Sequence, residues 1–580
     1  MNFCSRFLLV PALLLVFLVP TNAQAPVFDW ATTCASGNGY FGFSGWGPRV
    51  LAVDAQGNTY VAGAFNGAVA LGNTLLNATQ TYPGRNFPSD DFIAKLDPAG
   101  NYLWAVQLGD NQDARIGSLA VDGAGNVYVT GYFGSYSLAF GVSGPTLYNS
   151  SAESEGFVAK LNGVTRQWEW ARRVGGTGDD ALGATVISAA GDLYLLGRGD
   201  SPAIDVGPFI LVGPQNFLAK LNNVGTWQWA RPFGSTTTNV TQLLIIPQGG
   251  IYVAGTFTSP STSFGPITLT TRPVPGTRFY NSNDVFVAKT DDAGTWYWAV
   301  QGDAITHQNV ISRNLREAEL AYDGAGHLYL AGSYEGAAVR FGATVLPNQS
   351  VQAPQPNPLP PVPYTNNYYS DAYVAQLDAA TGAWGWAVRS GGPNNEKAFG
   401  VAADGQGRVY AMGDFASAVL GAENWQLLQL QAANGAVQAL TNLGTLGVRQ
   451  MALDGQSRLQ LAGYFETAAA SLPPLTLAQA GLGRQTGYVA RRAAAPLAAI
   501  QGQAASAGLN VWPNPTQNRQ VQVQGAAPGQ AVQVLDALGR LVSQARMPAA
   551  GPLLLVLPAS LPAGLYLVRG DGQARRLIVE

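Results

Sequence analysis

A short phrase recurs along the chain and limits the folds that the chain can adopt. The pattern Asp-x-x-Gly-Asn-x-Tyr-Val-x-Gly stands at 54–63 and returns at 122–131. Its last four residues recur, with changes, at 194–197, 252–255, 329–332, 410–413 and 460–463. The final glycines of the first and seventh copies, Gly63 and Gly463, are 400 residues apart, so one repeat is about 67 residues long. Self-similarity at a regular spacing predicts a repeat architecture.

Two further phrases follow the first one in most repeats. Phe-Val-Ala-Lys, or a close variant, stands at 92–95, 157–160, 217–220, 286–289, 373–376 and 488–491. A phrase that ends in Trp-Ala stands at 104–105, 170–171, 229–230, 298–299 and 386–387. Each repeat therefore predicts four short strands: A before the turn aspartate, B with Tyr-Val-x-Gly, C with Phe-Val-Ala-Lys and D with Trp-Ala. Asp-x-x-Gly-Asn between A and B is a good hairpin turn, and repeated four-stranded units are typical of a β-propeller.

The two ends of the repeat region complement each other. The seventh repeat stops after its strand C, at Arg492, while 28–31 reads Phe-Asp-Trp-Ala, a strand D without the three strands that should precede it. We expect this N-terminal strand to form the outer edge of the seventh blade and to close the ring. The prediction is an all-β fold, a seven-bladed β-propeller over 26–492.

These phrases resemble the bacterial seven-bladed propeller repeats known as SBBP repeats, over nearly all of 26–492. The resemblance implies a fold and little chemistry. The long connections between strands B and C, and the altered sixth and seventh copies, depart from a regular repeat.

The first 25 residues are typical of a secretory signal. Arg6 precedes an apolar run at 7–19, and Ala23-Gln24-Ala25 offers small residues around a cleavage site. The run of 13 residues is shorter than the roughly 20 that a membrane-spanning helix needs. We therefore expect a secreted or outer-surface protein without a transmembrane segment. Cleavage would leave Cys34 without a second cysteine, so no intrachain disulfide is expected.

A second, smaller unit follows the repeats. Residues 493–508 are rich in Ala and Gln and are typical of a linker, and 509–580 predicts a small β-sandwich domain. This domain resembles the C-terminal sorting domain, type A, of the type IX (Por) secretion system of Bacteroidetes. The residues that carry the resemblance are Trp512, Pro513, Asn514, Pro515, Asp536, Gly539, Leu561, Gly564 and Tyr566. The resemblance implies recognition by the outer-membrane secretion machinery. A small Ig-like sandwich that only stabilises or binds is the alternative.

The composition disfavours several classes of function. The formal net charge is −3, from 32 basic and 35 acidic residues, so the chain lacks the positive field that nucleic acids attract. Two cysteines and two histidines make a zinc or iron–sulfur site improbable. We expect no cofactor, no metal and no catalytic residue.

Repetition separates structural residues from candidates for function. The turn aspartates Asp54, Asp122, Asp323, Asp404 and Asp454 recur and are predicted to be structural, as are the ten of thirteen tryptophans that belong to strand D and should pack between blades. An exposed aromatic ladder for sugars is the alternative for those tryptophans. Trp46 and Trp425 break the pattern. Trp46, its neighbour Tyr40 and Trp425 are therefore the candidates for stacking against a ligand.

The connections between strands B and C vary most, from 9 residues at 416–424 to 36 at 335–370. In a propeller they emerge on one face, and variable loops on a rigid scaffold commonly carry binding. The leading hypothesis is a non-enzymatic, exported propeller that binds a glycan or a protein on this face. The alternatives are a polysaccharide-active hydrolase or lyase with Glu317 and Glu319 at the channel mouth, and a structural envelope component.

Overall fold

The structure, a computed structural model, divides the chain into two compact units, Met1–Ala494 and Ala495–Glu580, which are described separately. It describes residues 28–37, 47–78, 89–108, 114–271, 283–305, 318–348, 370–390, 395–415, 425–478, 486–493 and 510–579, with short gaps inside several of these ranges. The described residues form strands and turns and contain no helix. The predicted all-β fold is confirmed.

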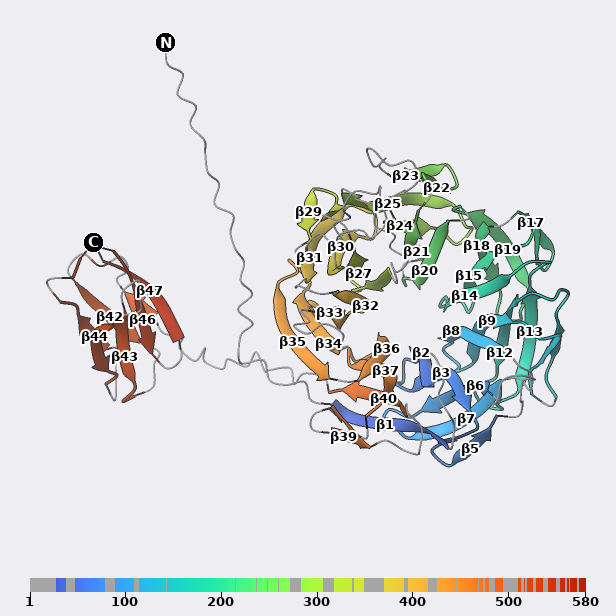
Figure 1. Ribbon diagram of the computed structural model, residues 1–580, viewed down its shortest axis with the longest axis horizontal. Helices are drawn as coiled ribbons and strands as arrows, with labels where there is room; N and C mark the ends of the chain where they lie inside the picture. Colours follow the sequence, from blue (N-terminus) through green and yellow to red (C-terminus); the bar gives the residue numbers. More distant parts are fainter. Residues whose placement is uncertain are drawn as a thin grey trace, which may run out of the picture. The chain divides into compact units, whose positions relative to one another are not determined.

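The first unit is a ring of sheets (Figure 1). Within the described ranges, seven groups of four antiparallel strands follow one another around it. From the inner to the outer strand, the first four groups are β2 (Gly47–Val53), β3 (Thr59–Asn66), β6 (Ser89–Leu96), β7 (Tyr102–Leu108); β8 (Arg115–Val121), β9 (Val127–Phe133), β12 (Glu155–Leu161), β13 (Trp168–Val174); β14 (Asp180–Ile187), β15 (Leu193–Gly199), β18 (Gln215–Leu221), β19 (Trp227–Phe233); and β20 (Thr238–Ile245), β21 (Ile251–Phe257), β24 (Asp284–Thr290), β25 (Trp296–Ile305).

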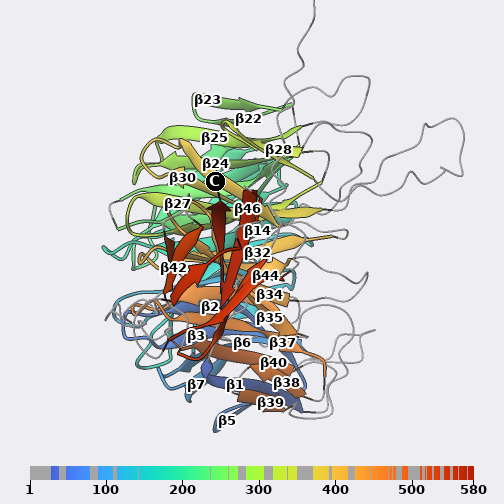
Figure 2. The same ribbon diagram turned by 90° about the vertical axis from the view of Figure 1, so that its left-hand side faces the viewer.

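The remaining three groups are β26 (Glu319–Tyr322), β27 (His327–Tyr334), β30 (Asp371–Asp378), β31 (Trp384–Ser390); β32 (Lys397–Ala403), β33 (Arg408–Asp414), β34 (Trp425–Gln431), β35 (Val437–Gly444); and β36 (Gly447–Leu453), β37 (Leu459–Phe465), β40 (Thr486–Arg492), β1 (Phe28–Gly37). Each group contains strands A to D of one repeat, except that β1 comes from the N-terminal end. The predicted closure is confirmed, because Ala31 pairs with Ala490 and Thr33 with Tyr488 in an antiparallel ladder. Viewed edge-on, the ring shows its outer strands β1 and β7 on the side (Figure 2).

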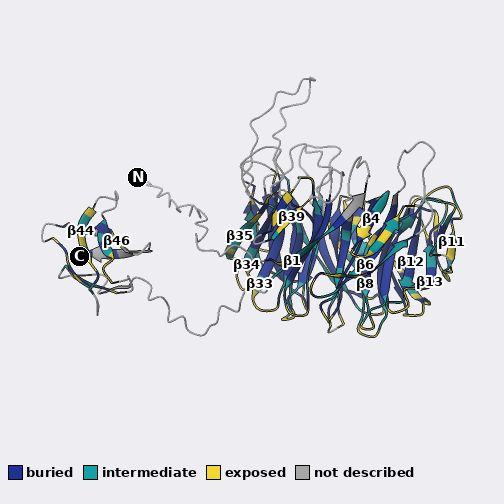
Figure 3. Ribbon diagram, turned by 90° about the horizontal axis from the view of Figure 1, so that it is seen from below, coloured by how far each residue is buried: buried dark blue, intermediate teal, exposed yellow. Residues whose placement is uncertain are grey.

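The middle strands of each blade are buried on both faces, because each sheet packs between two neighbours. All seven residues of β21 are buried, and so are six of the seven in β12 (Figure 3). One apolar cluster joins Tyr60 and Ile93 of the first blade to Val127 and Phe157 of the second. This two-sided burial explains why strands B and C are continuous apolar runs rather than alternating ones.

The repeated aspartate organises the A–B turn, as the sequence predicts. Asp54 Oδ1 accepts hydrogen bonds from the backbone N–H of Gln56 (3.0 Å) and Asn58 (2.8 Å), and Tyr60 donates its hydroxyl to Oδ2. Asp122, Asp323, Asp404 and Asp454 accept the equivalent backbone bonds in their own turns. These carboxylates are therefore structural.

The tryptophans of strand D fasten one blade to the next. The indole N–H of Trp170, on β13, donates to the carbonyl of Asn223 in the C–D turn of the following blade (3.2 Å), and its ring covers Gly225. The same bond, at 2.8–3.1 Å, joins Trp30 to Pro98, Trp229 to Asp292, Trp298 to Ala380 and Trp386 to Ala432. Because these rings lie against the neighbouring blade, they do not form an exposed ladder.

Strands B and C are connected through small hairpins in six of the blades. Their strands are β4 (Ala68–Leu71) and β5 (Thr74–Asn77), β10 (Ser137–Ala139) and β11 (Thr146–Tyr148), β16 (Ala203–Val206) and β17 (Phe209–Val212), β22 (Ser261–Phe264) and β23 (Ile267–Thr270), β28 (Ala338–Phe341) and β29 (Thr344–Pro347), and β38 (Ala469–Leu472) and β39 (Leu475–Ala478). Two of them, β4–β5 and β28–β29, extend the outer edge of the preceding blade by pairing with β1 and β25. The hairpins thus cover sheet edges that would otherwise be open.

The second unit contains two antiparallel sheets around a common core. One sheet contains β41 (Asn510–Trp512), β42 (Gln520–Gln524) and β45 (Leu553–Val556). The other contains β43 (Ala531–Leu535), β44 (Leu541–Arg546), β46 (Gly564–Gly570) and β47 (Gln573–Val579). Val521 and Leu555 of the first sheet and Val534 and Val568 of the second belong to one buried apolar cluster.

Candidate functional site

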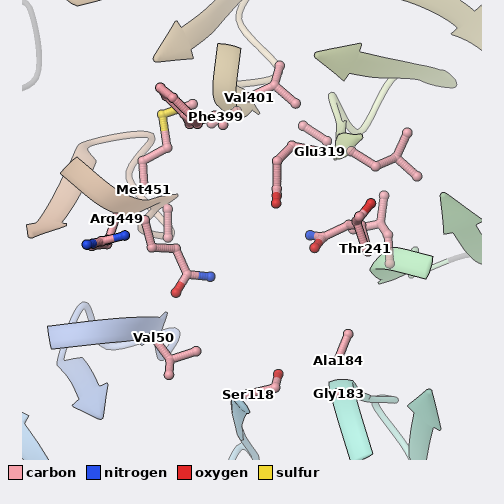
Figure 4. A pocket seen from close by; sticks show the side chains of 18 of the residues that line it. Val50, Ser118, Gly183, Ala184, Thr241, Glu319, Phe399, Val401, Arg449 and Met451 are labelled. Atoms are coloured by element: carbon pink, nitrogen blue, oxygen red, sulfur yellow. The ribbon is translucent and has the colours of Figure 1, made fainter. Parts of the chain in front are cut away.

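The inner strands of the seven blades surround a cavity of about 540 Å³ at the centre of the ring (Figure 4). Its lining comes from β2, β8, β14, β20, β26, β32 and β36, that is, from strand A of every blade. The charged side chains among the described lining residues are Arg49, Arg449 and Glu319. Much of the remaining wall is small or apolar, such as Ala184, Val401 and Met451.

Several polar groups of this wall are used to hold neighbouring blades together. Side chains in the middle of strand A bond to the backbone of strand A in the next blade, or of the residue just before it, and so join the inner strands of neighbouring blades. The bonds run from the Leu51 N–H to Gln450 Oε1 (2.6 Å), from the Thr185 N–H to Ser118 Oγ (3.1 Å), and from Thr241 Oγ1 to the Ala318 carbonyl (2.8 Å). These wall positions therefore have a structural use.

Burial shifts the pKa values of two charged groups near the cavity. Burial lowers the pKa of Arg49. The negative charge of Asp91 has the opposite, smaller effect, because it favours the protonated guanidinium. Burial raises the pKa of the Asp91 carboxyl to about 6, opposed by Arg49 and by the backbone N–H of Ile116, which donates to Oδ2 at 2.5 Å. Arg449 lies over the ring of Tyr464, with its guanidinium carbon 4.9 Å from the centroid.

The structure places one member of the predicted carboxylate pair in the cavity. Glu319 is the first residue of β26 and points into the space (Figure 4). Glu317 lies outside the described residues. Among the described residues that line the cavity, the acidic side chain is that of Glu319, whereas a glycoside hydrolase uses two carboxyl groups.

The predicted aromatic candidates are not brought together by the described residues. Trp46 and Tyr40 lie outside them. Trp425 begins β34, is partly buried, and packs its ring on Phe399 with the centroids 4.9 Å apart. A stacking role for these three residues stays a prediction.

One exposed aromatic pair was missed by the sequence analysis. Tyr136, just before β10, is 80% exposed, and Tyr148, at the end of β11, is 62% exposed; their ring centroids lie 6.1 Å apart. The sequence offers little signal for this pair, because tyrosines also stand in other B–C connections, such as Tyr82 and Tyr280.

The residues of the C-terminal resemblance are described only in part. Leu561 and Tyr566 are buried in the core of the second unit, and Tyr566 donates its hydroxyl to the carbonyl of Pro562 (2.8 Å). Trp512 ends β41 and Gly564 begins β46. Pro513, Asn514, Pro515, Asp536 and Gly539 lie outside the described residues, as do Ala23 and Ala25 of the signal segment.

The described residues contain no cluster of three or more His, Cys, Asp or Glu side chains suited to a metal ion. Within the same residues, no helix has the length and apolar character to cross a membrane.

Comparison with known proteins supports the predicted propeller repeat. Residues 103–132, which cover strand D of the first blade and strands A and B of the second, match the family model SBBP, described as a beta-propeller repeat. The chain is a β-propeller repeat protein. A stretch of 122 residues is 34% identical to an uncharacterized WD repeat-containing protein of Acanthamoeba polyphaga mimivirus. That match covers 19% of this chain and 9% of the viral protein, so the chain spans only a small part of that relative.

Solved structures show distant likenesses. The quinohemoprotein alcohol dehydrogenase of Comamonas testosteroni is 13% identical, with a TM-score of 0.36 over 82% of this chain and 78% of the enzyme. The Dos1 propeller is 8% identical, with a TM-score of 0.39 over 80% of this chain and 95% of its own. Likenesses at this level carry no argument about activity.

Proposed function

We propose that this protein is an exported binding scaffold that holds a glycan or a protein on the face formed by its B–C connections, without catalysis. The observation that carries the proposal is that the B–C hairpins are supported in the same way in most blades but present different side chains. Five of the six described hairpins contain a turn glycine with positive φ, such as Gly141 and Gly265. Each of these glycines packs against the first aromatic residue of strand D. The residue that pairs at the end of the second hairpin strand differs among the six described hairpins: Asn77, Tyr148, Val212, Thr270, Pro347 and Ala478.

A repeated support with different exposed side chains is suited to recognition, because the support fixes positions while the side chains select a ligand. The central channel is less suited to recognising a ligand. Several polar side chains of its wall, such as Gln450 and Ser118, are used in hydrogen bonds between blades.

The binding proposal is tested by passing the mature protein over cellulose, chitin, xylan and mannan, with retention scored against a bare matrix. A variant in which 349–369 is replaced by a short Gly-Ser linker should differ from the parent in its retention on the polysaccharides. Tyr297→Ala, on strand D, should be retained as the parent is. Retention that no B–C connection influences, or no retention at all, contradicts glycan binding on this face.

The enzymatic alternative has a direct test. Glu319→Gln removes the carboxylate that points into the channel and keeps its size. We expect polysaccharide retention to be unchanged and no reducing sugar to be released by either protein. Release of reducing sugar by the parent and its loss in the variant would replace the binding proposal with the hydrolase. A protein that self-associates and retains neither glycan nor protein would favour a structural envelope role.

Export and sorting belong to the same proposal. Residues 1–25 would direct export, with cleavage after Ala25, and 509–580 would be recognised by the type IX secretion machinery, which would leave the propeller secreted or at the outer cell surface. The two-sheet core that includes Leu561 and Tyr566 is compatible with a separately folded sorting domain. The test is the location of the full chain and of a chain ending at 508 in a host with that machinery. Equal delivery of both overturns the sorting role alone.

A further inference from the structure

The hairpin of the second blade carries two exposed tyrosines that form a pair. Tyr136 and Tyr148 are 80% and 62% exposed, and their rings meet at 70° with centroids 6.1 Å apart. The backbone N–H of Asn149 donates to the carbonyl of Tyr136 (2.9 Å), which holds the two positions beside each other. The pair is therefore an ordered feature of the surface, although both rings are in solvent.

Among the described hairpins, this pair occurs in that of the second blade. The hydrogen bond that links Asn149 to Tyr136 has counterparts in three other hairpins, where Gly67, Pro202 and Pro260 supply the carbonyl in place of Tyr136. The strand pairing that contains Tyr148 places Asn77, Val212, Thr270, Pro347 and Ala478 at its position. Because the hairpins form without tyrosine at either position, the fold does not require the pair.

Polar groups are fixed in the segment that follows Tyr148 and in the hairpin of the next blade. Arg173, on β13, donates from Nη1 to Ser150 Oγ (2.7 Å) and to Glu155 Oε1 (2.5 Å), and from Nη2 to Asp205 Oδ2 (3.3 Å). Ser150 lies two residues after Tyr148, whereas Asp205 belongs to the hairpin of the next blade. The buried Glu155 anchors the guanidinium, and the side chain of Asp205 is 43% exposed. Arg173 thus joins Ser150, two residues from Tyr148, to Asp205 on the hairpin of the next blade.

We infer that Tyr136 and Tyr148, with Ser150 and Asp205 beside them, form a saccharide-binding subsite. This inference rests on the proposed function and names its ligand class. The faces of aromatic rings are electronegative and attract the weakly positive C–H groups of a sugar ring. Carboxylate and hydroxyl oxygens accept and exchange hydrogen bonds with sugar hydroxyls.

Size favours a sugar over a protein partner. Two tyrosines offer at most about 500 Å² of surface, whereas a stable protein interface buries about 800 Å² on each partner around an apolar centre. One or two sugar rings fit the smaller area.

The first test is protection from nitration. The full chain is treated with tetranitromethane, which nitrates exposed tyrosines, with and without oligosaccharides prepared from whichever of cellulose, chitin, xylan or mannan retains it. Peptide mass spectrometry should show protection of Tyr136 and Tyr148. Tyr297, equally exposed at 62% but on strand β25, is the internal control and should react equally in both samples.

The second test compares the double variant Tyr136→Ala/Tyr148→Ala with Tyr297→Ala. We expect the double variant to bind the oligosaccharide at least about tenfold more weakly, and Tyr297→Ala to bind as the parent does. An unchanged thermal midpoint shows that the double variant is folded. If the parent binds and the double variant binds equally well, the inference is wrong and the proposed function stands. If the parent binds none of the four polysaccharides, the inference fails together with the glycan form of the proposed function.

Discussion

The closure of the ring places a glycine directly beneath the tryptophan of the N-terminal strand. Gly100 has φ +86°, and a Cβ atom there would lie 2.5 Å from two atoms of the Trp30 ring. Gly100→Ala would therefore carry two costs: about 1–2 kcal/mol for a non-glycine residue at positive φ, and about 1–3 kcal/mol for overpacking against the ring. The sum is a loss of about 2–5 kcal/mol in the free energy of unfolding.

Gly249→Ala is the matched control. Gly249 has φ +88° and donates its N–H to the carbonyl three residues earlier at 3.0 Å, as Gly100 does, but a Cβ atom would meet nothing within 4 Å. It should lose only about 1–2 kcal/mol.

The assay is urea unfolding of the mature chain, followed by tryptophan fluorescence, with midpoints compared at equal slopes. Equal losses in the two variants would mean that Trp30 does not press on Gly100, and would refute this account of how the ring is closed.

Three further predictions concern buried groups. The folded pKa of Asp91, about 6, is above the unfolded value of about 3.9, so between these pH values the folded protein keeps a proton that the unfolded chain releases. Stability should therefore fall as pH rises through this window, by up to about 3 kcal/mol, and Asp91→Asn should remove that slope in urea melts at pH 4 to 7. Burial raises the pKa of Cys34 to about 12, so its thiol should not react with Ellman's reagent until the protein is unfolded; reaction in the native state would contradict its burial. Glu155→Gln should lower the free energy of unfolding by about 1.5–3 kcal/mol, because Arg173 loses a charged acceptor, and an unchanged urea midpoint would show that the pair is not formed.

The repeat was enough to predict the fold because each phrase carries its own structural reason. The Asp54 turn needs an acceptor for two backbone N–H groups, and the tryptophan of strand D needs a glycine opposite it, so both recur in the sequence. Closure by 28–31 was predictable because a strand D lacked its own repeat. These requirements are local, and a sequence shows them directly.

The candidate site was harder to predict because exposed positions follow no pattern. Nothing in the repeat shows that Tyr136 and Tyr148 meet, since their contact depends on the register of a hairpin inside a variable connection. The link from Arg173 to Asp205 joins two repeats through side chains that lie outside the repeated phrases. Conversely, Trp425 broke the sequence pattern, yet in the structure it packs on Phe399.

Binding of the ligand on the B–C face can be measured directly. Hydrogen exchange with mass spectrometry, on the full chain with and without a retained oligosaccharide, tests it without any substitution. With the oligosaccharide bound, we expect hydrogen exchange to be slower in the connections around 134–154 and 200–214. Exchange in the A–B and C–D turns should be unchanged. Protection confined to those turns, or to the inner strands around Glu319, would contradict it.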